Sequence, residues 1–237
     1  MDRRSFMISA GAVALSASLL GYPALAQSAS AAAGGENARL KAMLDGFFYG
    51  RLEDSPERAT GLGLDKGERA DLRSQLSDYS AAGKAKDLAR AKAELAELRD
   101  IDRDRLSYGS TIDYDVVEYG LLRGITASER FPYGSAGGRF APYVISQLTG
   151  PYRGIPDFLD SQHPVENASD ADAYLSRLSQ FPTALDQSLE RQKEDAASGV
   201  FAPDYVLDTT LKQLHALRDQ PAAETILVSS LARRAKE

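Results

Sequence analysis

Chemistry that depends on histidine can use only two side chains in this chain, His163 and His215. Zinc peptidases commonly place two histidines four residues apart on a helix, with a glutamate between them as the base. Asn167 lies four residues after His163, and His215 lies beside an apolar stripe, so neither has this spacing. The 237 residues include no cysteine, which excludes disulfides, cysteine-ligated metals and cysteine nucleophiles. We therefore predict no catalytic residue, no metal ligand and no cofactor in this chain, and favour surface or boundary positions for both histidines.

A cluster of carboxylates and tyrosines is a second candidate for chemistry: Asp113, Tyr114, Asp115, Glu118 and Tyr119. Two carboxylates can act as acid and base when burial separates their pKa values. Acidic side chains near the start of a helix also complement the helix dipole while they stay hydrated. We favour this second interpretation, a solvated helix face.

Loops offer weaker signals for binding or catalysis. Gly134–Gly138 lacks both the Gly-Lys-Ser/Thr ending of a phosphate loop and the dinucleotide-binding spacing. The serines lack the Gly-x-Ser-x-Gly context of an activated nucleophile: Ser135, Ser146 and Ser161. Tyr143 and His163 follow the Gly/Pro-rich region, and functional residues concentrate in loops, so we keep these two as candidates for a cleft.

The elements that would position these residues are helices. An apolar stripe with steps of three and four predicts a helix over 81–101: Leu88, Ala91, Leu95, Leu98 and Ile101. Ser110 is the expected N-cap of the next helix, and Pro156 is expected to open a short helix through Gln162. We expect Ser169 to cap a helix that Pro182 ends, with a further helix ending at Gly199. The fold class is all-α, a multi-helix array with little or no β structure and a Gly/Pro-rich connection over 131–142.

The N-terminus has the pattern of a bacterial export signal. Arg3 and Arg4 are followed by Ser5 and Phe6, as in twin-arginine signals, and an uncharged apolar run covers 7–20. This run is short and rich in small residues, so it is a poor membrane span. The twin-arginine export machinery is accordingly an expected partner.

A small-x-small site at Ala24 and Ala26 predicts cleavage after residue 26. Residues 1–26 are then the signal peptide, 27–36 a flexible leader, and 37–237 a helical domain. The expected location is the periplasm or the cell exterior. No further segment approaches membrane-spanning length, so we expect no stable span in the mature form.

The formal net charge of −6 argues against a nucleic-acid partner, because such proteins need a basic surface. An apolar content of 43% is sufficient for a packed core, so the chain is expected to fold.

Several phrases, taken in order, resemble the bacterial exported family of domain-of-unknown-function 885. They are SPERATGLGL at 55–64, IDYDV at 112–116, YVISQLTG at 143–150, PDFL at 156–159, HP at 163–164, AYLSRL at 173–178, and Gly199 with Pro203. The resemblance runs from about Leu40 to the end of the chain. It implies a largely helical, zinc-dependent peptidase whose His-Glu-x-x-His helix lies in its C-terminal half.

The resemblance transfers fold and export to this chain, but no catalytic residue, because the zinc motif is absent from these residues. Zinc is implied only for a longer family member, in which a zinc-bound water would attack a peptide substrate. The chain also ends in mid-helix by its pattern, without a capping glycine. We therefore expect the N-terminal helical portion of a longer peptidase-like protein. A standalone periplasmic binding or structural module without catalysis is the alternative.

Overall fold

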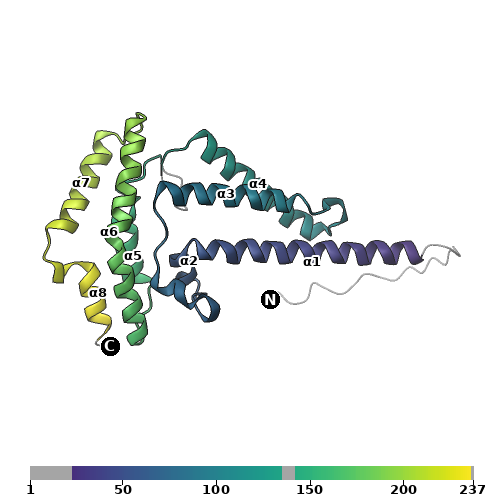
Figure 1. Ribbon diagram of the computed structural model, residues 1–237, viewed down its shortest axis with the longest axis horizontal. Coiled ribbons are helices and arrows are strands. Elements are labelled where there is room, and N and C mark those ends of the chain that lie inside the picture. Colours follow the sequence, from purple (N-terminus) through teal and green to yellow (C-terminus); the bar gives the residue numbers. More distant parts are fainter. Residues whose placement is uncertain (1–22, 135–141, 236–237) are drawn as a thin grey trace, which may run out of the picture.

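The computed structural model describes residues 23–134 and 142–235, with side chains from residue 34 onward (Figure 1). The described elements are helical, which confirms the all-α prediction; an isolated bridge joins Ser146 and Thr149. The helices are α1 (Pro23–Glu53), α2 (Pro56–Gly61), α3 (Ala81–Leu98), α4 (Tyr108–Arg130), α5 (Pro151–Ser161), α6 (Ala168–Ala197), α7 (Asp204–Asp219) and α8 (Ile226–Arg234). Three 3-10 turns connect them: η1 (Gly67–Ser74), η2 (Arg103–Arg105) and η3 (Ala222–Glu224).

The helices form two groups that run roughly perpendicular to each other in Figure 1. We call α1, α3 and α4 the arm, and α5 to α8 the body. Each group has its own apolar core, with Leu98 fully buried in the arm and Leu159 fully buried in the body. A smaller cluster of Leu52, Ala59 and Leu72 lies where α1, α2 and η1 meet, and joins the two groups.

In the arm, the structure confirms the predicted apolar stripe but differs from the predicted N-cap of the next helix. Leu95, Leu98 and Ile101 of the predicted stripe are buried in the arm core. The N-cap of α4 is Ser107, not Ser110; its side chain accepts a hydrogen bond from the Ser110 backbone N–H. Either serine could accept a hydrogen bond from a backbone N–H group that has no partner in the first helical turn. The local sequence therefore does not distinguish Ser107 from Ser110 as the N-cap.

The body corrects the predictions made at prolines. Helix α6 begins after its N-cap Asn167 and continues through Pro182, so the two helices expected on either side of this proline are one. Phe181 and Ala184 are buried in the body core, and this packing offsets the hydrogen bond that proline removes. Helix α5 opens at Pro151, one turn and a half before Pro156, which lies inside it.

Residues 27–36 differ from the predicted flexible leader, because α1 runs through them from Pro23. Alanine, which has the highest helix propensity, is frequent in this segment. Ala24 and Ala26 lie in the first turns of α1, whereas Arg3, Arg4 and Phe6 lie outside the described residues. None of the described helices is long and apolar enough to cross a membrane.

Candidate functional site

A groove of about 1080 Å³ lies at the junction of the arm and the body. Its walls come from the α1–α2 turn and the first turns of α3 on one side, and from α5 and α6 on the other. The segment Gln75–Tyr79, which has no regular secondary structure, runs along it. The groove therefore depends on residues more than 100 positions apart in the sequence.

Side chains hold the segment Gln75–Tyr79 in place. The backbone N–H groups of Leu76 and Tyr79 donate to the amide oxygens of Gln180 and Gln187 on α6, each at 3.0 Å. On the other side, Glu57 of α2 accepts from the Ser77 backbone N–H at 3.1 Å. Burial, with the nearby Glu57 charge, raises the pKa of Tyr79. The segment is thus fixed as part of the groove wall without belonging to a sheet.

Carboxylates outnumber cations along the groove. Asp54 is paired with Lys86 at 2.6 Å and with Arg90 at 2.5 Å. Burial opposes its ionised form, but these two cations together hold the pKa of Asp54 below its usual value. Asp87 forms no ion pair among the described residues, and burial together with the Asp54 charge raises its pKa. The arm side of the groove therefore presents negative charge that the described protein does not fully neutralise.

Arg191 closes the body side of the groove as a buried cation. Its guanidinium donates to the Gly134 carbonyl at 2.5 Å and to the Tyr79 carbonyl at 3.4 Å. Burial lowers the pKa of Arg191. One turn earlier on α6, the buried Ser188 hydroxyl has no hydrogen-bond partner within the described part of the chain. The groove lining therefore includes a guanidinium held by two carbonyls and a buried hydroxyl without a partner in the described structure.

Behind the groove, Arg177 of α6 is fully buried and joins separate elements. Its guanidinium donates to the carbonyls of Gln75 at 2.8 Å, Leu72 at 2.9 Å and Pro56 at 3.3 Å, and to the Thr60 hydroxyl at 2.8 Å. Burial lowers its pKa to about 10. Arg177 thereby ties α2 and η1 to α6, which positions one wall of the groove.

His163 is 1% exposed and packs against Arg177. Arg177 donates to His163 Nδ1 at 2.8 Å, so the ring must carry its proton on Nε2, which donates to the Asp170 carbonyl at 3.0 Å. The Asp170 carboxylate accepts from Arg73 at 2.6 Å, and Arg73 also bridges to Asp65. The histidine is therefore a neutral structural group in a polar network.

Acidification should weaken the fold through His163. Burial is the main reason that its pKa lies below the usual value, and the positive charges of Arg177 and Arg234 add to this effect. Below about pH 6.5 the unfolded histidine binds a proton that the folded one does not, so the unfolded state gains stability. We expect the free energy of unfolding, measured by urea denaturation, to fall between pH 6.5 and 5.

Two variants isolate this effect. His163→Asn, whose side-chain oxygen can still accept from Arg177, should flatten the decline between pH 6.5 and 5. His215→Asn, which changes an exposed histidine on α7, should keep it. A His163→Asn protein with an unchanged pH slope would contradict this origin.

Of the candidate residues named from the sequence, none that the structure describes lines the groove. Tyr143 is half-buried, and neither it nor His163 lines the groove. In the carboxylate cluster, Asp115 pairs with Arg103 at 2.7 Å and Glu118 with Arg99 at 3.0 Å, so these groups brace α4 against neighbouring elements. The groove residues that the sequence reasoning missed had one kind of available signal, because three of the family phrases contain them: SPERATGLGL at 55–64, YVISQLTG at 143–150 and PDFL at 156–159.

The donor set does not fit a zinc ion. Among residues 23–134 and 142–235, no three histidine, aspartate or glutamate side chains form a group that could hold a metal. Both ring nitrogens of His163 already have partners. Zinc in a longer relative would therefore need ligands other than those that the structure describes here.

The sequence profile described as "Bacterial protein of unknown function (DUF885)" matches residues 56–237. The chain belongs to the DUF885 family. Its match begins at α2, so it covers the body, most of the arm and nearly all of the groove. No curated protein matches the chain in sequence.

A solved crystal structure from Colwellia psychrerythraea, named there as a "putative lipoprotein", has a similar fold with a TM-score of 0.71. The two sequences are 18% identical, so the likeness concerns the fold alone. The match covers 85% of this DUF885 chain and 35% of the Colwellia chain. The DUF885 chain thus spans about a third of the length of that protein.

Proposed function

We propose that this chain is the N-terminal helical portion of an exported peptidase-like protein, and that its groove binds part of a peptide substrate. The observation that carries the proposal is the groove at the arm–body junction, with unpaired carboxylates along a fixed, extended wall. The family match over residues 56–237 and the partial coverage of the Colwellia structure support the portion of a larger protein. The export pattern of residues 1–26 supports a location outside the cytoplasm.

The charges of the groove favour a basic peptide. Asp87 and Asp157 lie along the groove and form no ion pair among the described residues, whereas Asp54 is paired with Lys86 and Arg90. Burial and the Asp54 charge raise the pKa of Asp87, and a lysine side chain or a peptide ammonium placed beside this carboxyl would favour its ionised form. The peptide would lie along Gln75–Tyr79, whose position is fixed before binding, which lowers the entropic cost of association.

Fluorescence anisotropy of the full chain tests this binding with two labelled eight-residue peptides, identical except that one has two lysines where the other has two glutamates. We expect the lysine peptide to bind at least ~5-fold more tightly, with the difference reduced at high salt because charge pairs are screened. Asp87→Asn should weaken the lysine peptide by about 3–10-fold. Asp172→Asn, which removes an exposed carboxylate of α6 outside the groove, is the matched control.

Equal affinity for both peptides, or an equal loss in Asp172→Asn, would refute the groove as the binding site. Mass spectrometry of the same mixtures, with zinc added, should show intact peptide, because the sequence holds no His-Glu-x-x-His motif. Zinc-dependent cleavage by this chain would overturn its assignment as a non-catalytic portion.

A further inference from the structure

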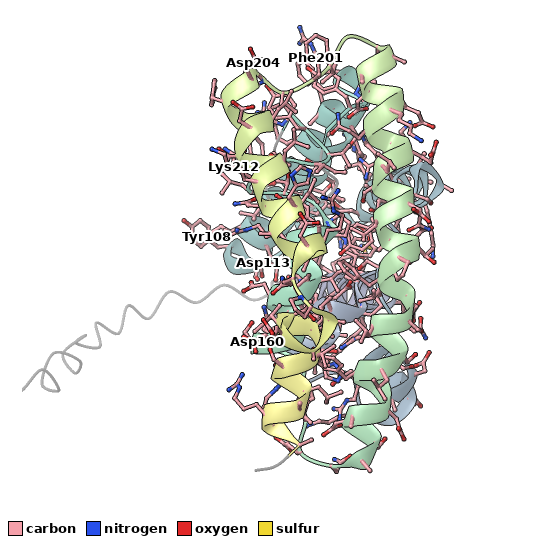
Figure 2. The ribbon with its side chains drawn as sticks, turned by 90° about the vertical axis from the view of Figure 1, so that its left-hand side faces the viewer. Tyr108, Asp113, Asp160, Phe201, Asp204 and Lys212 are labelled. Carbon is pink, nitrogen blue, oxygen red and sulfur yellow. The ribbon has the colours of Figure 1, made fainter. Side chains whose placement is uncertain are left out.

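The outward face of α4 carries large apolar side chains that nothing in the described structure covers. Tyr108 is 85% exposed, Ile112 46%, Val116 64% and Tyr119 66%, at steps of four, four and three. The opposite face, with Leu121, packs into the arm core. Tyr108 extends from the edge of the molecule in Figure 2. A stripe of this length on one helix is the pattern of a helix that packs on both sides.

Gly109 and Gly120 directly follow Tyr108 and Tyr119 on α4 and so lie beside the apolar stripe, which gives a second observation. A Cβ added at Gly109, Gly120 or Gly124 would meet no atom within 4 Å, so the described fold does not require these glycines. Glycine inside a helix costs stability relative to alanine, but it allows another backbone to approach closely. This face of α4 therefore has protruding apolar side chains next to glycines, where a second backbone could approach closely.

We propose that this face of α4 binds the same face of a second copy of the chain, as an antiparallel two-fold dimer. A two-fold axis beside residue 118 places Val116 of one copy opposite Gly120 of the second copy, so a protruding residue meets a shallow position. The same axis places Asp113 opposite Arg123 of the second copy. Neither side chain forms an ion pair within the described chain, and each lies five residues from the centre.

This charge arrangement favours a second copy over a membrane surface. A face with a carboxylate in one half and a guanidinium in the other is complementary to itself when reversed, whereas an anionic membrane surface would favour cations throughout. The contact between Tyr108 and Ser128 is about 30 Å long, because a helix rises ~1.5 Å per residue. A pair of helices of this length is a small interface, so the dimer should dissociate in the micromolar range.

Sedimentation velocity of the full chain from about 1 to 200 µM tests the dimer. We expect a reversible monomer–dimer equilibrium. Val116→Asp should raise the dissociation constant at least ~10-fold, as should Gly120→Leu, which fits the open space in a single chain. Leu175→Asp makes the matched change at an exposed leucine of α6 and should leave the equilibrium unchanged. Circular dichroism establishes that each variant is folded.

A charge exchange identifies the partner as a second copy. Asp113→Arg alone and Arg123→Asp alone should each weaken the dimer by ~5-fold or more. The double variant Asp113→Arg/Arg123→Asp should return it to within ~2-fold of the original, because each exchanged residue meets its exchanged counterpart. A monomer at 200 µM, association that Val116→Asp does not change, or no recovery in the double variant would each overturn the proposal.

Discussion

Replacing Arg177 with methionine should lower the free energy of unfolding by about 3 kcal/mol, as measured by urea denaturation followed by circular dichroism. The variant leaves the Gln75 carbonyl and His163 Nδ1 buried without their donor, and each such group costs about 1–3 kcal/mol. The carbonyls of Pro56 and Leu72 lose one donor each but keep the Thr60 hydroxyl and the Gln75 backbone N–H. Removing a charge that burial disfavours offsets part of this loss. Methionine retains much of the apolar stem of Arg177, so the change removes the guanidinium together with its stacking on the Phe158 ring, which lies 4.8 Å from the guanidinium carbon.

Lysine should restore little of the lost stability at this position. One ammonium cannot reproduce a planar fork that reaches α2, η1 and His163 together. Arg218→Met is the matched control, because Arg218 is exposed and, within the part of the chain that the structure describes, bonds only the adjacent Asp219. This variant should change stability by less than about 0.5 kcal/mol. If Arg177→Lys were as stable as the original protein, a single positive charge at this position would be sufficient for stability. The proposal that the planar guanidinium is needed to join α2 and η1 to α6 would then be wrong.

Leu98→Ala should destabilise the arm by about 2–5 kcal/mol, since Leu98 is fully buried among α1, α3 and α4. The loss combines the transfer of apolar surface with the cavity left between tightly packed helices. Leu122→Ala removes the same atoms from a leucine of α4 that is 38% exposed, and should cost much less. The measurement is again urea denaturation at neutral pH, with hydrogen exchange of α3 and α4 amides to locate the effect.

The hydrogen-exchange result distinguishes a loss of arm packing from a general effect. We expect amides in α3 and α4 to lose protection more than those in α5 and α6, because the two groups have separate cores. Equal costs for Leu98→Ala and Leu122→Ala would contradict the burial of Leu98 as the cause.

Apolar spacing was sufficient to predict the helices, because Leu95, Leu98 and Ile101 bury one face of α3 regardless of their distant partners. The limits of the helices were less predictable. Pro182 ends a helix on local grounds, yet α6 continues through it because residues on both sides pack against α5 and α8. Such packing depends on segments distant in the sequence, which no local pattern contains.

The residues that shape the groove were hidden for a related reason. Arg177 and Arg191 lie on an amphipathic helix, where an arginine ordinarily faces solvent. Both are buried because backbone carbonyls from 57 to 121 positions away accept from them. His163 was considered for a cleft because of its loop position, but its ring is occupied by Arg177 and Asp170. Sequence spacing cannot report a partner that only the tertiary fold supplies.

The bonds of Arg177 also impose an order on folding. Its acceptors Pro56, Leu72 and Gln75 precede it by 121, 105 and 102 residues. At a synthesis rate of about 5–20 residues per second, Arg177 is made roughly 5–20 s after its acceptors in α2 and η1. Closing so long a loop is slow relative to forming a local helix hairpin. The helices of the arm core all lie within residues 23–130, so this core can form first, and the groove is among the last features of the chain to be completed.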